Sequence, residues 1–550
     1  MSALEEKLTA ALAAYQSRII RDCGLLPELM LLETTRALDS AAYDSSIASR
    51  TEMTEHEHER RRFRILGAAT ALQPLVRSLE RTNRGVPDVC SDEALSQFTD
   101  SYLYNCGLFA HVRRLAGLER YGLAASVFIN DDHAVLEVDN DYPEQHDLRL
   151  LQWLQDAITD DAHLREHILH SEVVKRLDRY VGLDHHGYIR YDNDDDLIEY
   201  YRAIAFDRAL RFFEGEALPL DSVIGGRPFG DWRAAAAAAG GRVLQHVAFA
   251  IRLKERYPQL SLRNLLTVFS RNEDIWEVLL GTGEPTAHLA PLLRAMTLDA
   301  AKTDAYAADH EIPLPFHIDF GEQIVLLPCF GALLNPMAHV VRFLRANFGS
   351  DWDRAVARRE LLFRNSIRDL LPPQRFLVKP AGVRLRRPDG SVITDIDAIV
   401  LDREFGSLAL LQLKWHDVHG RSLRERESRR RNLISANDWV DRLVTWINGR
   451  SAADVAAALD VRGASPDRPP YVCVMTRYAA QFVSDEPYDD RASWFGWADL
   501  VSMTQRAPAE DLLRILADLY EGGLGWEPLE EEFAPAVFHF EEITVEIRVV

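Results

Sequence analysis

The chain has 550 residues, 47% of them hydrophobic, and its 63 Lys and Arg against 85 Asp and Glu give a formal net charge of −22. This length and composition predict a large core and two or three domains. The acidic balance argues against a protein that coats nucleic acid along its whole surface. The five cysteines lack CxxC or zinc spacing, and the N-terminus lacks a basic and apolar leader, so we expect a cytoplasmic protein without membrane contact.

Helical periodicity dominates residues 1–345. Two short strand pairs are expected within this region, at 124–138 and at 316–327. The region contains no motif that names a function. We therefore predict a mainly α region with small β insertions and a sensing or regulatory role. A partner protein or a second copy of the chain would bind through this region. The expected helices cover 4–20, 62–82, 148–157, 164–181, 197–214 and 232–257.

From residue 346 the pattern changes to helices that alternate with short strands. A helix over 351–371 ends at a pair of prolines. The C-terminal residues 506–550 are expected to add a helix and a strand that pack on the domain formed by 346–505. The other expected elements are strands at 375–379, 383–386 and 471–477, and a long amphipathic helix over 421–448.

Two further runs, 394–401 and 407–415, are expected to form buried strands that carry polar residues. The break between them is short enough for an antiparallel hairpin. Side chains alternate along a strand, so Asp395 and Asp397 share one face, as do Gln412 and Lys414. The expected register places Asp397 opposite Gln412 and Asp395 opposite Lys414, with Cβ atoms about 5 Å apart. Such a cluster has the chemistry of a divalent metal site beside a phosphate.

The spacing from Asp397 to Gln412-Leu413-Lys414 resembles the motif of the PD-(D/E)xK nucleases, which have the restriction-endonuclease-like fold. A glutamine in place of the second acidic residue is similar to the Mrr-type branch. The resemblance covers roughly residues 350–505. It implies an α/β nuclease domain with a mixed sheet and a requirement for Mg²⁺ or Mn²⁺.

The resemblance also implies roles for individual residues. The metal ligands would be Asp397, the Gln412 side-chain oxygen and the Leu413 carbonyl, with Asp395 as a further ligand. Glu360, on the first helix, would complete the catalytic set. An ordinary solvated helix carboxylate is an equally weighted interpretation of Glu360.

Lys414 stands out because the chain contains only six lysines, at 7, 175, 254, 302, 379 and 414. A compact ammonium can orient a water or offset charge on a phosphate where a broad guanidinium fits poorly. We therefore interpret Lys414 as catalytic. The alternative is a strand-end lysine whose amine extends to solvent.

Basic residues are concentrated near the motif, because residues 351–450 hold 20 Lys and Arg against 14 Asp and Glu. Such a patch is typical of contact with a phosphate backbone. The alternative is a solvated helix whose arginines pair with Glu425 and Glu427. The arginines that we expect to contact nucleic acid are Arg384, Arg386, Arg424, Arg426, Arg429 and Arg430.

The sequence therefore predicts a metal-dependent endonuclease that hydrolyses phosphodiester bonds, with DNA as the expected substrate. By resemblance, restriction or anti-phage defence is the expected setting. The alternative is a catalytically inactive nuclease-fold protein that acts as a nucleic-acid-binding or scaffold module.

Overall fold

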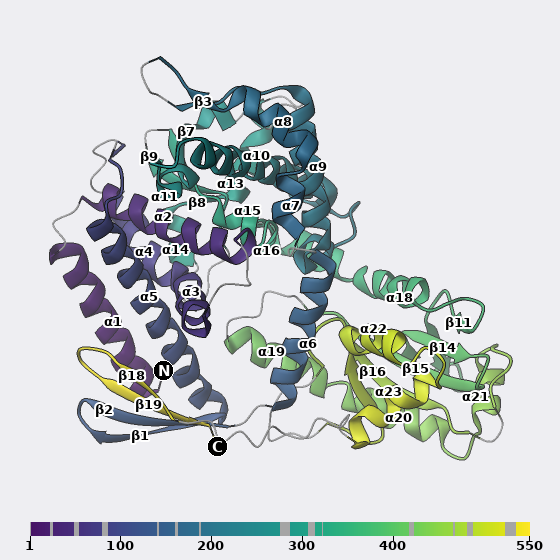
Figure 1. Cartoon of the computed structure of the whole chain (residues 1–550). Helices are drawn as coiled ribbons and strands as arrows, with labels where there is room; N and C mark the ends of the chain where they lie inside the picture. Colours follow the sequence, from purple (N-terminus) through teal and green to yellow (C-terminus); the bar gives the residue numbers. More distant parts are fainter. Residues whose placement is uncertain are drawn as a thin grey trace. The chain divides into compact units, whose positions relative to one another are not determined.

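The computed structural model divides into two compact units (Figure 1). The first, which we call the helical unit, comprises Met1–Val138, Asp156–Trp352 and Pro535–Arg548. The second, the sheet unit, comprises Asp139–Gln155, Asp353–Ala534 and Val549–Val550. The structure describes residues 2–22, 26–48, 54–79, 86–87, 89–139, 142–159, 163–185, 189–275, 286–305, 314–321, 323–416, 423–465, 468–480, 488–522 and 535–549.

The helical unit is built around α10 (Phe229–Arg256), which packs against α9 (Asp195–Arg211). Gly241 permits this close approach, since a Cβ there would lie 2.8 Å from the Cα of Arg202. The other helices wholly in this unit are α1 (Ala3–Asp22), α2 (Pro27–Ser46), α3 (Glu55–Leu66), α4 (Ala68–Leu79), α5 (Glu93–Ala116), α7 (Leu164–Ile168), α8 (Ser171–Tyr180), α11 (Leu262–Leu266), α13 (Thr286–Met296), α14 (Ala300–Ala305), α15 (Phe330–Leu334) and α16 (Ala338–Asn347), with 3₁₀ turns η2 (Gly117–Tyr121) and η4 (Phe213–Glu216).

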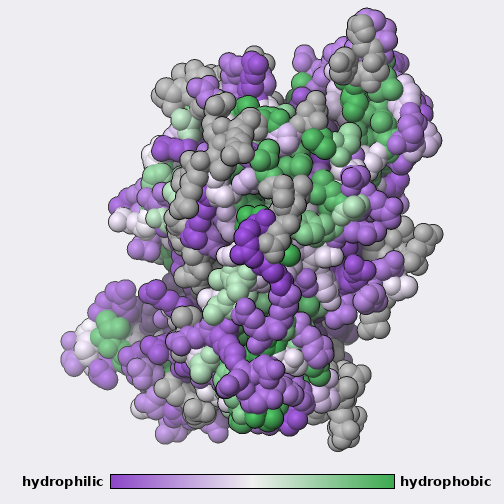
Figure 2. Space-filling view, turned by 90° about the vertical axis from the view of Figure 1, so that its left-hand side faces the viewer, coloured by the Kyte–Doolittle hydropathy of each residue, from purple (hydrophilic) through white to green (hydrophobic). Residues whose placement is uncertain are grey.

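Within the described residues, α10 is the one helix long and apolar enough to cross a membrane by length and composition. Its most apolar window is 78% buried inside the structure, which is typical of a core helix. On the face shown in Figure 2, hydrophilic side chains predominate and hydrophobic ones form smaller patches between them.

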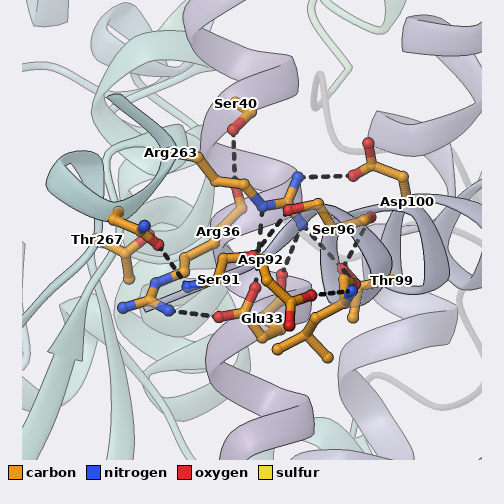
Figure 3. A network of polar contacts seen from close by, with 12 residues as sticks. Glu33, Arg36, Ser40, Ser91, Asp92, Ser96, Thr99, Asp100, Arg263 and Thr267 are labelled. Atoms are coloured by element: carbon orange, nitrogen blue, oxygen red, sulfur yellow. Dashed lines mark hydrogen bonds and ion pairs between the residues drawn. The ribbon is translucent and has the colours of Figure 1, made fainter. Parts of the chain in front are cut away.

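A buried polar network joins α2, α5 and α11 (Figure 3). The Arg263 guanidinium donates to Asp100 at 2.9 Å and to the Thr99 hydroxyl at 2.8 Å. On α2, the fully buried Glu33 pairs with Arg36 and also lies 3.9 Å from Arg263 of α11. Because buried charges are costly unless they are paired, these bonds fix how the three helices meet.

Two four-stranded sheets complete the helical unit. One has the order β7-β10-β9-β8, and the other has the order β1-β2-β19-β18. The strands are β1 (Ala124–Asn130), β2 (His133–Val138), β7 (Val268–Arg271), β8 (Thr297–Leu298), β9 (His317–Gly321), β10 (Ile324–Leu327), β18 (Ala536–His539) and β19 (Thr544–Val549), and short pairs form between β3 (Gly182–Leu183) and β4 (Ile189–Arg190) and between β5 (Val223–Ile224) and β6 (Arg227–Pro228).

The C-terminal strands correct one prediction. We expected residues 506–550 to pack on the domain that carries the motif, and the helix α23 (Leu512–Gly522) does so. The strands β18 and β19 instead extend the β1–β2 hairpin of the helical unit. Val545 and Ile547 are buried there against Leu136 and Leu4, and this apolar burial explains the pairing.

The sheet unit contains a mixed five-stranded sheet of order β11-β14-β15-β16-β17. The first three strands are antiparallel, and β16 and β17 continue parallel to β15. A separate hairpin is formed by β12 and β13. The strands are β11 (Phe376–Val378), β12 (Val383–Arg386), β13 (Val392–Ile396), β14 (Ala398–Asp402), β15 (Ser407–Lys414), β16 (Tyr471–Thr476) and β17 (Ser493–Gly496).

Helices cover both faces of this sheet. Alternate residues of β15 enter different cores: Leu408 and Leu410 belong to one cluster, and Ala409, Leu411 and Leu413 to the other. The first cluster includes α20 (Asn437–Ile447) and α21 (Ala452–Ala458), and the second includes α18 (Arg359–Leu370), α22 (Trp497–Arg506) and α23.

Two expected long helices are each divided into two. The helix expected over 351–371 is α17 (Gly349–Val356) followed by α18, and the one expected over 421–448 is α19 (Leu423–Ile434) followed by α20. Two helices, α6 (Tyr142–Thr159) and α17, each cross a boundary between the two units, so that part of each helix belongs to either unit. The structure confirms a mainly helical first part and a later unit with a mixed sheet.

Candidate active site

The start of β14 brings Asp397 against β15. The Asp397 backbone N–H donates to the Leu411 carbonyl at 3.0 Å, and the ladder pairs Ala398 with Leu411. The Gln412 side-chain amide and the Leu413 N–H, at 2.8 Å, both donate to the same Asp397 carboxylate oxygen. The structure therefore places Gln412 against Asp397, as the expected register predicts.

Asp395 does not lie where the sequence predicts. We expected one continuous strand over 394–401 with Asp395 opposite Lys414. The chain instead leaves the ladder at Asp397, and β13 pairs with β12, so that Asp395 is exposed and faces Arg384. The Asp395 charge nevertheless influences the pKa values of both Asp397 and Lys414.

The Asp397 carboxyl group is 4% exposed, and its pKa is raised to about 7. Burial is the main cause, because it penalises the charged form. The hydrogen bond from Leu413 N–H opposes the shift, while the charges of Glu360 and Asp395 add to it. A carboxyl group in this setting changes protonation near neutral pH.

Lys414 ends β15 and is half-buried. Burial lowers the pKa of its amine, while the charges of Asp397 and Asp395 act in the opposite direction. Within the described part of the chain, its ammonium forms no ion pair at 4.0 Å or less. The amine thus interacts electrostatically with the Asp397 carboxylate without forming a salt bridge to it.

Arg364 is a residue that we did not predict from the sequence. This buried side chain on α18 donates to the Asp397 backbone carbonyl and pairs with Glu360. Its position four residues after Glu360 was the available signal, since such pairs face each other on a helix. The Glu360 carboxylate therefore lies near Asp397 but is bound by Arg364, and its side chain is 48% exposed.

A glycine makes room beside this contact. A Cβ at Gly382 would lie 2.9 Å from the Ile396 carbonyl oxygen and 3.2 Å from Arg364 Nη2. Any larger residue there would press on the backbone that carries Asp397.

An aromatic cluster supports the end of β15. The Arg477 guanidinium lies over the rings of Trp497, Trp415 and Phe363, at 4.6, 5.0 and 5.6 Å from their centroids. The Arg477 backbone N–H donates to the Lys414 carbonyl at 2.8 Å. These contacts fix the backbone that presents Lys414.

The donor atoms around Asp397 suit a hard divalent cation. In a strand, the N–H and C=O of one residue point to the same side. Since the Leu413 N–H reaches Asp397, the Leu413 carbonyl is directed to that side as well. The Gln412 amide presents its nitrogen to Asp397, so it must turn over to offer Oε1 to a metal ion. Carboxylate, carbonyl and amide oxygens are the ligands that Mg²⁺ takes.

This donor set is poor in negative charge. Among the residues that the structure describes, no group of three or more His, Cys, Asp or Glu side chains could hold a metal ion. A cation at Asp397 would therefore rely on neutral oxygens and on ligands from substrate or water.

The expected nucleic-acid-binding arginines differ in exposure. Arg384 and Arg386 are exposed on β12, and Arg424 is exposed on α19. Arg426 is only 7% exposed, which corrects our expectation that it reaches a phosphate, because the helix turns its side chain inward.

The other α19 arginines are partly engaged within the helix. Arg430 and Arg431 both pair with Glu427 at 2.8 Å, which lowers the pKa of Glu427 to about 2. Arg429 is half-buried. Arg424 is thus the most accessible of the four predicted α19 contacts.

Comparison of the chain with protein-family models, with curated proteins and with solved structures gives no match.

Proposed function

We propose that the sheet unit is a metal-dependent nuclease of the PD-(D/E)xK type that hydrolyses phosphodiester bonds in DNA, in restriction or anti-phage defence. The observation that carries the proposal is the contact of Asp397 with Gln412 and Leu413. These two residues directly precede Lys414 at the end of β15. These are the residues of the motif, and the fold brings them together although fifteen residues separate Asp397 from Gln412.

The order of elements supports the same proposal. Helix α18 precedes three antiparallel strands, β11, β14 and β15, and helices α19–α21 lead to β16, which is parallel to β15. Helix, three antiparallel strands, helix and parallel strand is the order that the resemblance implies. The β12–β13 hairpin is an insertion into it.

The residues would divide the chemistry as follows. A bound Mg²⁺ would be held by Asp397, the Gln412 oxygen and the Leu413 carbonyl, and would supply Lewis-acid polarisation of the phosphate. Lys414 would donate a hydrogen bond to the attacking water or to the phosphate, and its lowered pKa eases proton exchange with that water. The exposed Arg384 and Arg424 would contact phosphates of the nucleic-acid backbone.

A second candidate is a nucleic-acid-binding module without catalysis. It is favoured by Gln412 in place of a carboxylate and by the pairing of Glu360 with Arg364, which together leave Asp397 as the one buried carboxylate that the described residues place against Gln412 and Leu413. Both candidates predict DNA binding, and only the first predicts cleavage.

The test is cleavage of supercoiled plasmid by the full chain with Mg²⁺, Mn²⁺ or chelator. Lys414→Ala is expected to reduce the rate by about 10²–10⁴-fold, the usual contribution of a positioned proton-transfer group. Lys379→Ala is the matched control, because Lys379 is the other lysine of the sheet unit and its amine donates to the Leu459 carbonyl. Equal cleavage by wild type and Lys414→Ala would reject the assignment, and binding without cleavage by the wild type would select the second candidate.

A further inference from the structure

A cavity of about 470 Å³ lies within the helical unit, between α10, the segment that follows β4, and the sheet that contains β7 and β10. Its volume is in the range of small-molecule sites. The walls are mostly apolar, and the side chains that matter for binding are Tyr191, Arg242, Val243, Leu266, Phe269 and Leu327.

Arg242 brings a positive charge to this apolar cavity. Among the described residues its guanidinium has no carboxylate partner and makes one long hydrogen bond, at 3.4 Å, to Gln245. Arg242 is exposed to solvent, while partial burial by neighbouring atoms lowers the pKa of its guanidinium. Gln245 is itself held by Asn193, to which its amide donates at 2.6 Å.

A second donor lines the same cavity. The Tyr191 hydroxyl has no hydrogen-bond partner in the described part of the chain, and burial raises its pKa to about 12, so it stays protonated. A guanidinium and a phenol are both donors, and together they suit a ligand that accepts hydrogen bonds.

The other ionisable side chains of the cavity do not favour a cation. Asp192 is exposed and lies 3.5 Å from Arg190, and Asp274 accepts from the Arg271 N–H. The pKa values of the two lining histidines, His246 and His317, are lowered to about 4 and about 3 by burial, so both are neutral at pH 7. Among the described residues, Arg242 is therefore the one lining cation without a carboxylate partner.

We propose that this cavity binds a small organic anion whose aromatic body lies against Val243, Leu266 and Phe269 and whose anionic group pairs with Arg242. Aromatic carboxylates and nucleoside monophosphates both combine an aromatic body with an anionic group in this way. The site belongs to the helical unit and does not depend on nuclease activity in the sheet unit.

The test compares two fluorescent probes that share one body. 8-Anilinonaphthalene-1-sulfonate carries an anionic group, and N-phenyl-1-naphthylamine does not. The full-length wild type is expected to bind the anionic probe at least tenfold more tightly than the neutral one. Arg242→Gln should remove that preference, and Lys175→Gln should keep it, because Lys175 is an exposed cation of the same unit.

Val243→Trp provides a second test, since a larger side chain should fill the cavity and weaken the binding of both probes at least tenfold. Displacement of the anionic probe by adenosine 5′-monophosphate would identify a phosphate ligand, and displacement by indole-3-acetate a carboxylate. An unchanged preference in Arg242→Gln, equal binding of both probes by the wild type, or failure of both competitors would overturn the proposal. Thermal unfolding of each variant confirms that it is folded.

Discussion

At the residue scale, the Asp397 carboxyl group combines burial with two hydrogen bonds from β15. Its pKa of about 7 means that the folded chain holds a proton there between about pH 4 and pH 7 that the unfolded chain does not. Stability contributed by this group is therefore present at low pH and is lost as pH rises through 7. A metal ion would compete with that proton, so metal binding should strengthen with pH.

Asp397→Asn is expected to unfold at a higher temperature than the wild type at pH 8 and to lose this advantage at pH 4. An asparagine keeps an oxygen for the Leu413 N–H but carries no charge at any pH. Each kcal/mol of unfolding free energy corresponds to a shift of about 2–4 °C in Tm for a unit of this size. The measurement is the difference in Tm between variant and wild type at each pH. Asp39 also has a pKa of about 7, but it is present in both proteins, so its titration cancels in this difference. A difference independent of pH would contradict the assigned shift.

Gln412→Glu is expected to place a second carboxylate against Asp397. Two adjacent carboxylates repel each other, so the variant should be less stable than the wild type without metal, by about 1–3 kcal/mol, and should be rescued by Mn²⁺. The measurement is Tm with and without Mn²⁺. Gln374→Glu, on an exposed turn of the same unit, is the control. If Mn²⁺ raised the Tm of both variants equally, Asp397 and Gln412 would not form a metal site.

At the element scale, α19 shows that a helix rich in arginine offers few of them to a partner. Leu423, Arg426 and Leu433 are buried, and Glu427 binds Arg430 and Arg431. Under the proposed function, contact with a phosphate backbone would therefore depend on Arg424 and on the exposed strand β12 rather than on the whole cluster. Arg421 lies outside the described residues.

Arg424→Gln and Arg384→Gln are each expected to lower the slope of log affinity against log salt by about 1, without a change in sequence preference. Arg368→Gln is the matched control, since Arg368 lies on α18 beside Asp369 and is 48% exposed. The measurement is fluorescence anisotropy with duplex DNA over a range of salt concentrations. Slopes that stay at the wild-type value in both variants would show that this surface does not contact DNA.

At the scale of the whole molecule, the strands β18 and β19 belong to the same unit as the helix α1. The β18–β19 hairpin closes the β1–β2 sheet, and Val545 is fully buried against Leu4 and Leu136. Leu4 and Val545 thus belong to one core, and the main part of the sheet unit, Asp353–Ala534, lies between them in the sequence.

Val545→Asp is expected to destabilise the helical unit by about 3 kcal/mol or more, because it places an unpaired charge in a core. Val537→Asp should cost little, since Val537 is 50% exposed on the neighbouring strand. Hydrogen exchange should show increased exchange in α1, α5 and β2 for the first variant, with protection of β14 and β15 retained. Loss of protection in β14 and β15 instead would show that the hairpin supports the sheet unit.

Features that depend on neighbouring residues could be predicted from the sequence. Strand periodicity and the short turn at 402–406 were enough to place Asp397 against Gln412, because register follows from alternation and loop length. The same local patterns predicted a mainly helical first part and a mixed-sheet unit after it.

Features that depend on residues far apart in the sequence could not be predicted from local patterns. The break at Asp397 arises because β13 pairs with β12, the burial of Arg426 depends on what packs around α19, and β19 finds its partner about 400 residues earlier in the chain. The cavity around Arg242 is likewise assembled from five separate segments, at 191–193, 239–249, 266–275, 317 and 327–329. Burial and strand pairing between distant segments are set by the free energy of the whole core, which no local periodicity records.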